Sequence, residues 1–457
     1  MIGRGEIVAR VREWGLREDV VEKDYVLGWM LWGIGTDPEL SVRWAFKGGT
    51  CLKKCYIETY RFSEDLDFSV LPGPPMSEEA VVVAITRTLA RIEEASGIDC
   101  SVRPPVLRQR PDGKSLEGRI YYRGPRAAPE AASIKIDLSM TETVVRPPVL
   151  RRISHPYPDG LPEPASVRCY SFEEVFAEKI RAMGERGLPR DLYDIVNLFW
   201  RGDLHAHGPM IRDVLVEKCQ TKGVPVPTLA ELEGAATRAG LESEWANMLG
   251  HQLPALPPFE TFWAEIPNLF AWLEGAEGAG PLAPITAGDD EDHSWSPPAT
   301  VWTWGAGVPL EPVRFAAANR LCVELGYHGT VRVIEPYSLR RTRAGYLLLH
   351  ALRADNRQHR SYRVEQITSV RVTTRPFRPV FRVEFSSAGP LAAPPARGAW
   401  RASSAFVSSG PVYVVQCAQC DRLFRRKTRT TDLRAHKDSD GYPCYGRHGY
   451  LVDEGYD

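Results

Sequence analysis

The sequence predicts a mixed α/β (α+β) N-terminal half, in which a sheet is followed by a helical bundle, and a small all-β domain with a metal-binding tail behind it. Residues 1–275 alternate helical and strand patterns, and short runs of alternating β-branched residues recur over 301–386. Cysteines gather in the tail, 410–457. A segment rich in Gly, Ala, Pro and acid, 276–300, is expected to be a linker.

The N-terminal half is predicted to hold its sheet core up to about residue 140 and its helices over 170–275. WAFKGG and SEDLDFSV are typical of two short strands, with the helix TCLKKCYI between them, and SEEAVVVAITRTLARIEEASG predicts a long helix. Three further strand-like runs follow, GIDCSVRPPVL, LEGRIYYRG and ASIKIDLSM. We therefore expect a mixed sheet that precedes the helical bundle.

The C-terminal half shows period-two alternation between closely spaced turns, which favours a small antiparallel barrel. A loop, AGPLAAPPARG, separates it from the tail. The runs expected to form its strands are CVELGY, TVRVIEP, GYLLLHALR, HRSYRVEQI, SVRVTT and VFRVEF.

Composition excludes several classes of protein. The 57 Lys and Arg nearly balance the 58 Asp and Glu, so contacts with nucleic acid must come from local patches. Neither a signal peptide nor an apolar run long enough to span a membrane is visible, which predicts a cytoplasmic protein without membrane contact. Buried free thiols are expected at Cys51, Cys55, Cys100, Cys169, Cys219 and Cys322.

Two carboxylates in SEDLDFSV suggest a metal site. On a strand, Asp65 and Asp67 point to one face while Leu66 and Phe68 face the core. Like charges so close are tolerated when a divalent cation bridges them, and oxygen ligands with open positions suit Mg²⁺ (or Mn²⁺) bound to a nucleoside triphosphate. Asp137, on the polar face of ASIKIDLSM, could complete the metal site.

A phosphate seat is predicted between the first strand and its helix. Gly48 and Gly49 lack side chains, so a phosphate can approach the backbone and the free N–H groups of the helix. Thr50 is expected to cap the helix and to offer its hydroxyl to the phosphate. One helix and a loop then return the chain antiparallel, which brings Asp65 into the same cleft.

Further charged groups lie on two later helices. Ser171 and Glu174 form a capping-box pattern at the start of the first, where Lys179 lies at the edge of the apolar stripe and can present its ammonium to a phosphate. Asp191 and Asp194 are one turn apart on the second, where they could meet Lys179 or the metal. Taken singly, each motif is more typical of an exposed strand edge, a turn or a surface ion pair, but their joint order favours a nucleotide site.

Together these motifs resemble the AbiEii/AbiGii group of bacterial nucleotidyltransferase toxins over roughly residues 5–273. The resemblance implies a polymerase-β-like fold and the transfer of a nucleotide from an NTP to an acceptor, a tRNA 3′ end or a protein hydroxyl. It also implies a toxin or phage-defence effector, which a separate antitoxin protein would neutralise. The segments that carry the resemblance are Glu22-Lys23-Asp24-Tyr25, Phe46-Lys47-Gly48-Gly49-Thr50, Arg61-Phe62-Ser63-Glu64-Asp65-Leu66-Asp67-Phe68, Glu174 through Lys179, and Arg190-Asp191-Leu192-Tyr193-Asp194.

The same resemblance implies roles for individual residues. The segment from Lys47 to Thr50 would hold the triphosphate, Asp65 and Asp67 the magnesium, and Lys179 the phosphates. Asp191 would be an acid essential to catalysis. The group often has Ser where this chain has Thr50, and the hydroxyl is kept.

The stretch from Arg314 to Pro379 resembles a WYL domain, an Sm-like small barrel. Its name-giving triad falls at Gly345-Tyr346-Leu347, so the tryptophan is missing. Such domains are thought to sense nucleotides or nucleic acid through a basic, aromatic pocket, and a solvated strand face accounts for the arginines equally well. The candidate pocket residues are Tyr346, Arg353, Arg360 and Arg363.

The tail has the spacing of a zinc knuckle. Cys417, Cys420, His436 and Cys444 supply the four ligands of a closed tetrahedral Zn²⁺ site, and His448 is a substitute fourth ligand. The basic run RRKTRTTDLR between the ligands could contact phosphates or form a solvated loop. A rival to the enzyme hypothesis is a non-catalytic regulator, in which the WYL-like and zinc modules bind nucleic acid or a nucleotide.

Overall fold

The chain divides into two compact units, Met1–Pro394 and Pro395–Asp457. The fold comes from a computed structural model. It describes residues 1–57, 61–74, 76–201, 207–276, 282–286, 288, 290–292, 310–384, 411–420, 422–426, 428, 430–437, 443–444 and 446–456.

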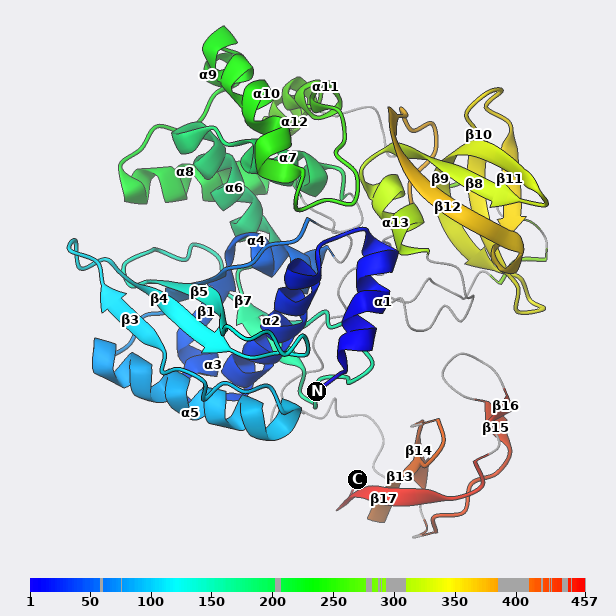
Figure 1. Ribbon diagram of the computed structural model, residues 1–457, viewed down its shortest axis with the longest axis horizontal. Coiled ribbons are helices and arrows are strands. Elements are labelled where there is room, and N and C mark those ends of the chain that lie inside the picture. The colour runs from blue at the N-terminus through cyan, green and yellow to red at the C-terminus, as the bar shows by residue number, and fades with distance from the viewer. Residues whose placement is uncertain are drawn as a thin grey trace. The chain divides into compact units, whose positions relative to one another are not determined.

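A seven-stranded mixed sheet forms the centre of the first unit (Figure 1), with strand order β3-β4-β5-β2-β1-β7-β6. Strand β2 runs antiparallel to β1 and parallel to β5. The antiparallel return from β1 to β2 was predicted and is confirmed. The strands are β1 (Trp44–Lys47), β2 (Leu66–Val70), β3 (Val106–Gln109), β4 (Ser115–Tyr122), β5 (Ala132–Ser139), β6 (Val149–Arg152) and β7 (Ser166–Cys169).

The predicted end of the sheet core near residue 140 is wrong, because β6 and β7 follow it and β7 pairs with β1. Both strands are only four residues long, too short for an alternation to stand out. The strand predicted over GIDCSVRPPVL is also wrong in its bounds. Its strand begins after Pro104 and Pro105, which cannot donate to a sheet ladder.

Two long helices, α2 (Glu18–Thr36) and α5 (Glu78–Ser96), pack together on the same side of the sheet. Ser77 caps α5 by accepting a hydrogen bond from the backbone N–H of Ala80. Three shorter helices, α1 (Arg4–Trp14), α3 (Leu40–Arg43) and α4 (Gly48–Cys51), and a π-helical turn, Leu52–Tyr56, complete this part.

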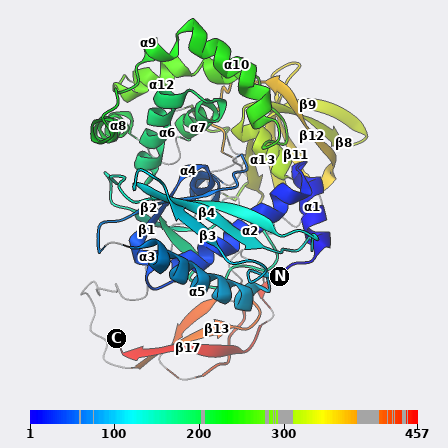
Figure 2. The ribbon, with the colours of Figure 1, turned by 60° about the vertical axis from the view of Figure 1, so that its left-hand side comes forward.

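The helical bundle lies on the other side of the sheet from α5, as Figures 1 and 2 both show. Ser171 caps its first helix by accepting from the N–H of Glu174, but the reciprocal half of the predicted capping box is wrong. The Glu174 carboxylate instead accepts from the N–H groups of Val145 and Arg146 and pairs with Lys218. The bundle contains α6 (Phe172–Arg186), α7 (Pro189–Phe199), α8 (Gly208–Lys222), α9 (Leu229–Leu232), α10 (Ala235–Leu249), α11 (Phe259–Trp263) and α12 (Ile266–Leu273).

The β-rich part begins with a helix that the sequence did not reveal, α13 (Glu311–Ala318), and continues as a five-stranded antiparallel sheet of order β11-β10-β9-β8-β12. Among the described strands the end strands β11 and β12 are not paired, so a closed barrel is not confirmed. The described residues of VFRVEF form no strand. The strands are β8 (Leu321–Tyr327), β9 (Thr330–Arg341), β10 (Leu347–Arg353), β11 (His359–Arg363) and β12 (Ile367–Pro376).

Part of the predicted linker belongs to this β-rich part. Ile285 is buried among its apolar residues, and Glu291 forms a β-bridge with Thr342. Other linker residues, including 293–300, lie outside the described residues, as do residues 301–309 and the loop AGPLAAPPARG.

The second unit contains a three-stranded sheet of order β14-β13-β17 and a two-stranded β15–β16 ladder. Their bounds are β13 (Pro411–Cys417), β14 (Leu423–Arg426), β15 (His436–Lys437), β16 (Pro443–Cys444) and β17 (Gly449–Tyr456). Across the described part of the chain, none of the helices is long and apolar enough to cross a membrane.

A buried ion pair joins α2 to the π-helical turn. Lys54 Nζ lies 2.8 Å from Asp24 Oδ2, and both side chains are almost fully buried. Burial raises the pKa of Asp24, but the charges of Lys54 and Lys53 outweigh burial and lower it below its usual value. Asp24 belongs to the motif Glu22-Lys23-Asp24-Tyr25, and this ion pair gives it a structural role.

We predict that Lys54→Met lowers the free energy of unfolding by about 3–5 kcal/mol, because it leaves the Asp24 carboxylate buried without its partner. Urea titration measures the change. Lys23→Met, which removes a partly exposed pair with Glu64, should cost less than about 1 kcal/mol. Equal losses in the two variants would contradict a structural role for the buried pair.

Candidate active site

The register of the sheet brings the predicted acidic residues to one face. Asp67 on β2 is the direct partner of Asp137 on β5 and of Lys47 on β1. Leu66 and Phe68 are buried, so the predicted alternation is confirmed. Asp65, just before β2, is exposed.

The carboxylate of Asp67 lies in an unfavourable place for a negative charge. Burial raises its pKa, and the neighbouring charges of Asp65 and Asp137 raise it further, while Lys47 and Lys179 only partly oppose the shift. A divalent cation on this wall would offset the repulsion that the sheet imposes.

Gly48 is fixed by this carboxylate. Its φ of +78° lies in the left-handed region, and a Cβ placed on it would lie 2.2 Å from Asp67 Oδ2. A Cβ on Gly49 would lie 2.8 Å from Arg61 Nη2. The glycines therefore keep the start of α4 open beside the acidic wall, as the predicted phosphate seat requires.

The prediction that Thr50 caps the helix is wrong. Helix α4 already begins at Gly48, with Lys47 at the capping position, and the Thr50 side chain is fully buried. Its hydroxyl donates a 2.5 Å hydrogen bond to the backbone carbonyl of Asp65. Thr50 thus ties the glycine turn to the segment that carries Asp65.

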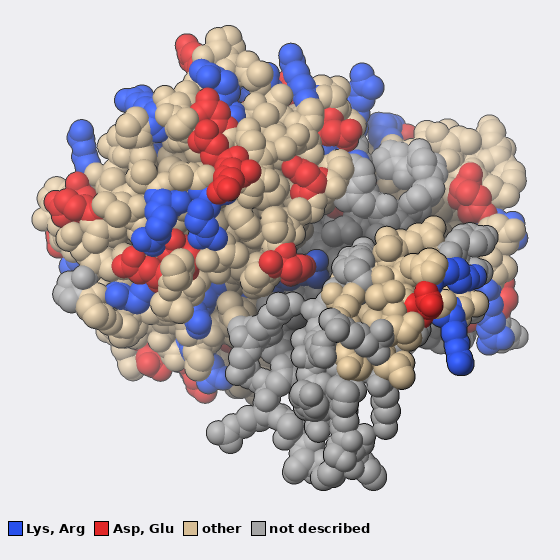
Figure 3. All heavy atoms as spheres, turned by 90° about the horizontal axis from the view of Figure 1, so that it is seen from below, with Lys and Arg blue, Asp and Glu red and all other residues tan. Residues whose placement is uncertain are grey.

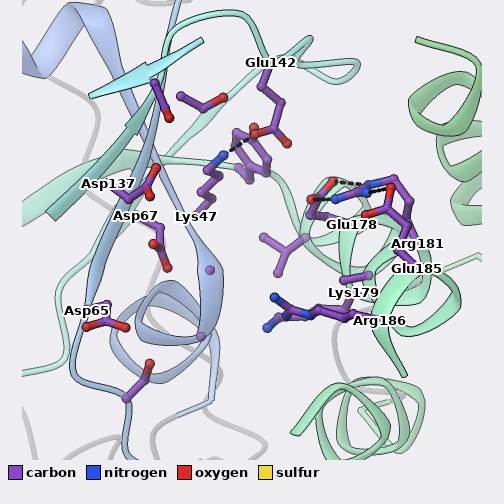
Figure 4. A pocket seen from close by; sticks show the side chains of 18 of the residues that line it. Lys47, Asp65, Asp67, Asp137, Glu142, Glu178, Lys179, Arg181, Glu185 and Arg186 are labelled. Carbon is purple, nitrogen blue, oxygen red and sulfur yellow. Dashed lines mark hydrogen bonds and ion pairs between the residues drawn. The ribbon is translucent and has the colours of Figure 1, made fainter. Parts of the chain in front are cut away.

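A cavity of about 960 Å³ lies over this wall, between the sheet and helices α6 and α8. Figure 4 shows Asp65, Asp67 and Asp137 on one side and Lys179, Arg181 and Arg186 from α6 on the other. Lys and Arg outnumber Asp and Glu in the lining, which suits a polyanionic ligand. The charged residues of the lining are Lys47, Arg61, Glu64, Asp65, Asp67, Arg110, Lys114, Lys135, Asp137, Glu142, Glu178, Lys179, Arg181, Glu185, Arg186, Arg190, Lys218 and Lys222.

Lys179 is held in place by Asp194. Its Nζ lies 2.6 Å from Asp194 Oδ2, and Arg61 Nε and Nη2 donate to the same carboxylate at 2.8 and 2.9 Å. Burial raises the pKa of Asp194, but Arg61 and Lys179 outweigh it and hold that pKa well below its usual range. Both cations also line the cavity, so Asp194 fixes two positive charges there.

Asp191 does not line the cavity. It is fully buried and accepts two hydrogen bonds from Arg186, at 2.7 and 2.8 Å, and the Arg186 side chain reaches the cavity. The structure therefore places Asp191 behind Arg186. Asp194, one turn further along α7, is also buried and absent from the lining, and it holds Lys179 and Arg61 there.

A second charged network lines the wall near β1. Lys47 pairs with Glu142, and Lys218 lies 2.7 Å from Glu174 and 3.4 Å from Glu178. Burial raises the pKa of Glu178, but Arg181 and Lys218 outweigh burial and lower it to about 2. These ion pairs connect β1 and the loop after β5 with helices α6 and α8.

The acidic wall does not hold its three carboxylates close enough for all of them to ligate one ion directly. Among the described residues, the carboxylate oxygens of Asp65, Asp67 and Asp137 do not all lie within 4.8 Å of one another. Magnesium keeps several waters and needs only one or two direct carboxylates, so a spaced acidic wall suits it.

The tail brings its four predicted zinc ligands together. The ligand atoms of Cys417, Cys420, His436 and Cys444 all lie within 4.8 Å of one another. The Sγ atoms of Cys417 and Cys444 are 3.8 Å apart, and Cys420 Sγ lies 3.3 Å from His436 Nε2. This arrangement matches the ligand set of a closed tetrahedral site.

Backbone groups around the four residues also favour a metal site. The N–H groups of Gln419 and Gly446 donate to the sulfurs of Cys417 and Cys444, and the Gln419 N–H is the main cause that lowers the pKa of Cys417 to about 6. His436 Nδ1 lies 2.8 Å from the carbonyl of Arg434, which orients the ring. His448, the substitute ligand, lies apart and pairs with Asp432.

The four residues predicted for a WYL-type pocket do not converge. Arg363 lies over the ring of Tyr346, 4.4 Å from its centroid. Arg360 and Arg363 occupy positions of opposite parity on β11, so they point to opposite faces of the sheet. Arg353 pairs with Asp355 on a neighbouring turn.

A pocket of about 450 Å³ on the β-rich part contains Arg363 but is built mainly by residues that the sequence did not single out. His350 Nε2 lies 2.9 Å from Glu291 Oε1, and its Nδ1 lies 3.0 Å from His359 Nε2. Burial lowers the pKa of His350 to about 4. Sequence reasoning missed Glu291 because it lies in the segment predicted to be a linker. Of the residues in this pocket, only His350 and His359 are of a type that suggests a functional site.

The cysteine prediction is confirmed. Cys51, Cys55, Cys100, Cys169, Cys219 and Cys322 are all buried free thiols.

A family model covers most of the central sheet and the helical bundle. Residues 31–265, just over half of the chain, match the family described as nucleotidyl transferase AbiEii toxin, type IV TA system. The chain belongs to this family of nucleotidyltransferase toxins. A comparison with curated proteins found no match.

Two solved structures are similar to parts of the chain. One is MenT4, a nucleotidyltransferase toxin from Mycobacterium tuberculosis H37Rv, at 19% identity and a TM-score of 0.43 over 61% of this chain and 91% of that one. The other is an antigenic nucleotidyltransferase-like protein from Paracoccidioides brasiliensis, at 13% identity and a TM-score of 0.27 over 46% of this chain and 91% of that one.

We predict that Gly48→Ala abolishes nucleotide binding, measured by calorimetry, and lowers the free energy of unfolding by at least about 1–2 kcal/mol. The added Cβ meets the Asp67 carboxylate and is strained at a positive φ. Gly240→Ala, on an exposed turn of α10 with nothing within 4 Å, should bind normally. Normal binding by Gly48→Ala would mean that the phosphate seat lies elsewhere.

Proposed function

We propose that the protein is a magnesium-dependent (or manganese-dependent) nucleotidyltransferase that transfers NMP from an NTP to an acceptor hydroxyl. One observation carries the proposal: a glycine turn opens directly beside three carboxylates, and a wall of fixed cations faces them across one cavity. A triphosphate with its metal needs both walls at once.

In this reaction the acceptor oxygen bonds to the α-phosphorus of the NTP, and the bond between the α-phosphorus and the bridging oxygen to the β-phosphate breaks. Pyrophosphate leaves, and the hydroxyl proton passes to solvent. Asp65 and Asp67, with Asp137 beside them, would hold Mg²⁺, which supplies charge stabilisation at the phosphates. The backbone N–H groups at Gly48 and Gly49 would bind phosphate oxygens.

The cationic wall would stabilise the leaving pyrophosphate. Lys179 keeps donors besides the one that faces Asp194, and its carboxylate partner holds the ammonium at the cavity. Arg186 presents its guanidinium while Asp191 fixes its orientation. Asp191 is therefore a positioning residue that acts through Arg186.

Family membership supports a wider role as a toxin or phage-defence effector that a separate antitoxin protein silences in the cytoplasm. The acceptor would be the 3′ end of a tRNA or a protein hydroxyl. The strand order of the β-rich part, in which the last strand returns to pair with the first, supports a WYL-like module that senses nucleic acid or a nucleotide.

We predict that Asp67→Asn reduces transfer of labelled nucleotide to background without lowering the melting temperature. Because the pKa of Asp67 is raised in the folded state, its ionised form costs folding free energy at neutral pH, and the neutral amide removes that cost. Asp19→Asn, on the surface, should remain fully active. Transfer at the unaltered rate by Asp67→Asn would refute the catalytic assignment.

We propose in addition that the tail binds one structural Zn²⁺ through Cys417, Cys420, His436 and Cys444. Elemental analysis of the full chain should find one zinc per molecule, and Cys444→Ser should lose it. His448→Ala and Cys100→Ser should both retain the metal, because neither side chain lies in the cluster. Loss of zinc in His448→Ala with retention in Cys444→Ser would reverse the ligand assignment.

A further inference from the structure

Three buried thiols gather beside the helix that begins at the phosphate seat. Cys51 ends α4, and Cys55 lies four residues later on the π-helical turn that continues it, so the two side chains are neighbours. Cys169 ends β7 and is the register partner of Phe46 on β1. All three side chains are fully buried, and the proposed transfer reaction uses none of them.

The sulfur atoms of these three cysteines converge, although they come from three different elements. All three lie within 4.8 Å of one another. Among the described residues, the tail cluster is the only other group of three or more Cys, His, Asp or Glu ligand atoms that is this close. A metal–sulfur bond of about 2.3 Å sets three sulfurs about 4 Å apart around a trigonal ion. The spacing therefore suits one ion held by three thiolates.

The number of ligands selects the metal. A closed structural zinc site takes four ligands, and iron–sulfur clusters are held by four cysteines. Within the described part of the chain, no fourth Cys, His, Asp or Glu joins the group. The Tyr56 hydroxyl lies 3.9 Å from Cys169 Sγ, but it already donates to the carbonyl of Tyr170. Soft thiolates also select Cu⁺, which is stable with three ligands in a plane.

A cation lies beside the three sulfurs. The Arg151 guanidinium is 4.8 Å from the centroid of the Tyr56 ring, and its positive charge acts on Cys55 and Cys169. On the face of the molecule seen from below, Lys and Arg lie at the surface among Asp and Glu (Figure 3), whereas Arg151 is half-buried. Because a negative charge is costly to remove from water, buried thiolates need such a cation nearby.

We propose that Cys51, Cys55 and Cys169 together bind one Cu⁺ ion. Each ligating thiol loses its proton to solvent as its sulfur–copper bond forms, and no electron is transferred because the metal enters in the monovalent state. Since the three side chains are fully buried, the ion would enter while the chain folds. It would join α4, which begins at the phosphate seat, to β7, which pairs with β1. The inference does not depend on the proposed transferase function.

The test first removes the tail cysteines, because their thiolates would also bind copper. The full chain with Cys417→Ser/Cys420→Ser/Cys444→Ser is produced in copper-supplemented cells and purified without oxygen, and elemental analysis should find one copper per chain. A further Cys169→Ser should lower the copper content at least about tenfold. A further Cys100→Ser, which instead removes a buried thiol outside the group, should leave the copper content unchanged.

Two measurements on the chain without a core substitution keep the test independent of whether Cys169→Ser folds. X-ray absorption at the copper edge should show three sulfur neighbours and no nitrogen. The copper-loaded chain should melt at a higher temperature than the copper-free chain, because the ion binds only the folded site. Equal copper in the Cys169→Ser and Cys100→Ser variants would overturn the inference, as would a chain without copper, zinc in its place, or nitrogen among the neighbours.

Discussion

The site depends on one close contact, the carboxylate of Asp67 against the backbone of Gly48. Sheet pairing sets it, because β1 and β2 are neighbours in register and β1 ends where α4 begins. A carboxylate so placed requires a residue without a side chain at the turn, where φ is positive, and strand pairing puts Asp137 beside Asp67 on the same face. The resulting excess of negative charge is what a cation would relieve.

The opposite wall follows from the same electrostatic constraint. The cations that face the acidic wall have carboxylate partners: Asp194 pairs with Lys179 and Arg61, and Asp191 pairs with Arg186. Such pairs stabilise the fold little beyond their desolvation cost. Their effect is to hold cationic donors in place along the cavity, which is the preorganisation that the proposed NTP site would use.

Much of this site could be predicted from local patterns, because period-two alternation places Asp65 and Asp67 together and glycines mark the turn. The sequence suggested Asp137 as a third carboxylate, but pairing between distant segments could not be read from a single sequence, so the register that sets Asp137 opposite Asp67 and the addition of β7 to the sheet stayed hidden. Thr50 was mistaken for a cap because the helix starts two residues earlier, at glycines that favour no helix. The arginines of β11 were a different case, since the odd separation of Arg360 and Arg363 already places them on opposite faces.

Helix α7 connects the site to the β-rich part. It carries Asp191 and Asp194 toward the site, and on another side the Tyr193 hydroxyl donates a 2.7 Å hydrogen bond to Asn319, at the end of α13. Both groups are fully buried, so separating them would leave two polar atoms unsatisfied at a cost of about 1–3 kcal/mol each. Any shift of α13 that kept this bond would therefore have to move α7, and with it the carboxylates that hold Lys179 and Arg186. This buried hydrogen bond thus links the helix that holds the cationic wall to the β-rich part.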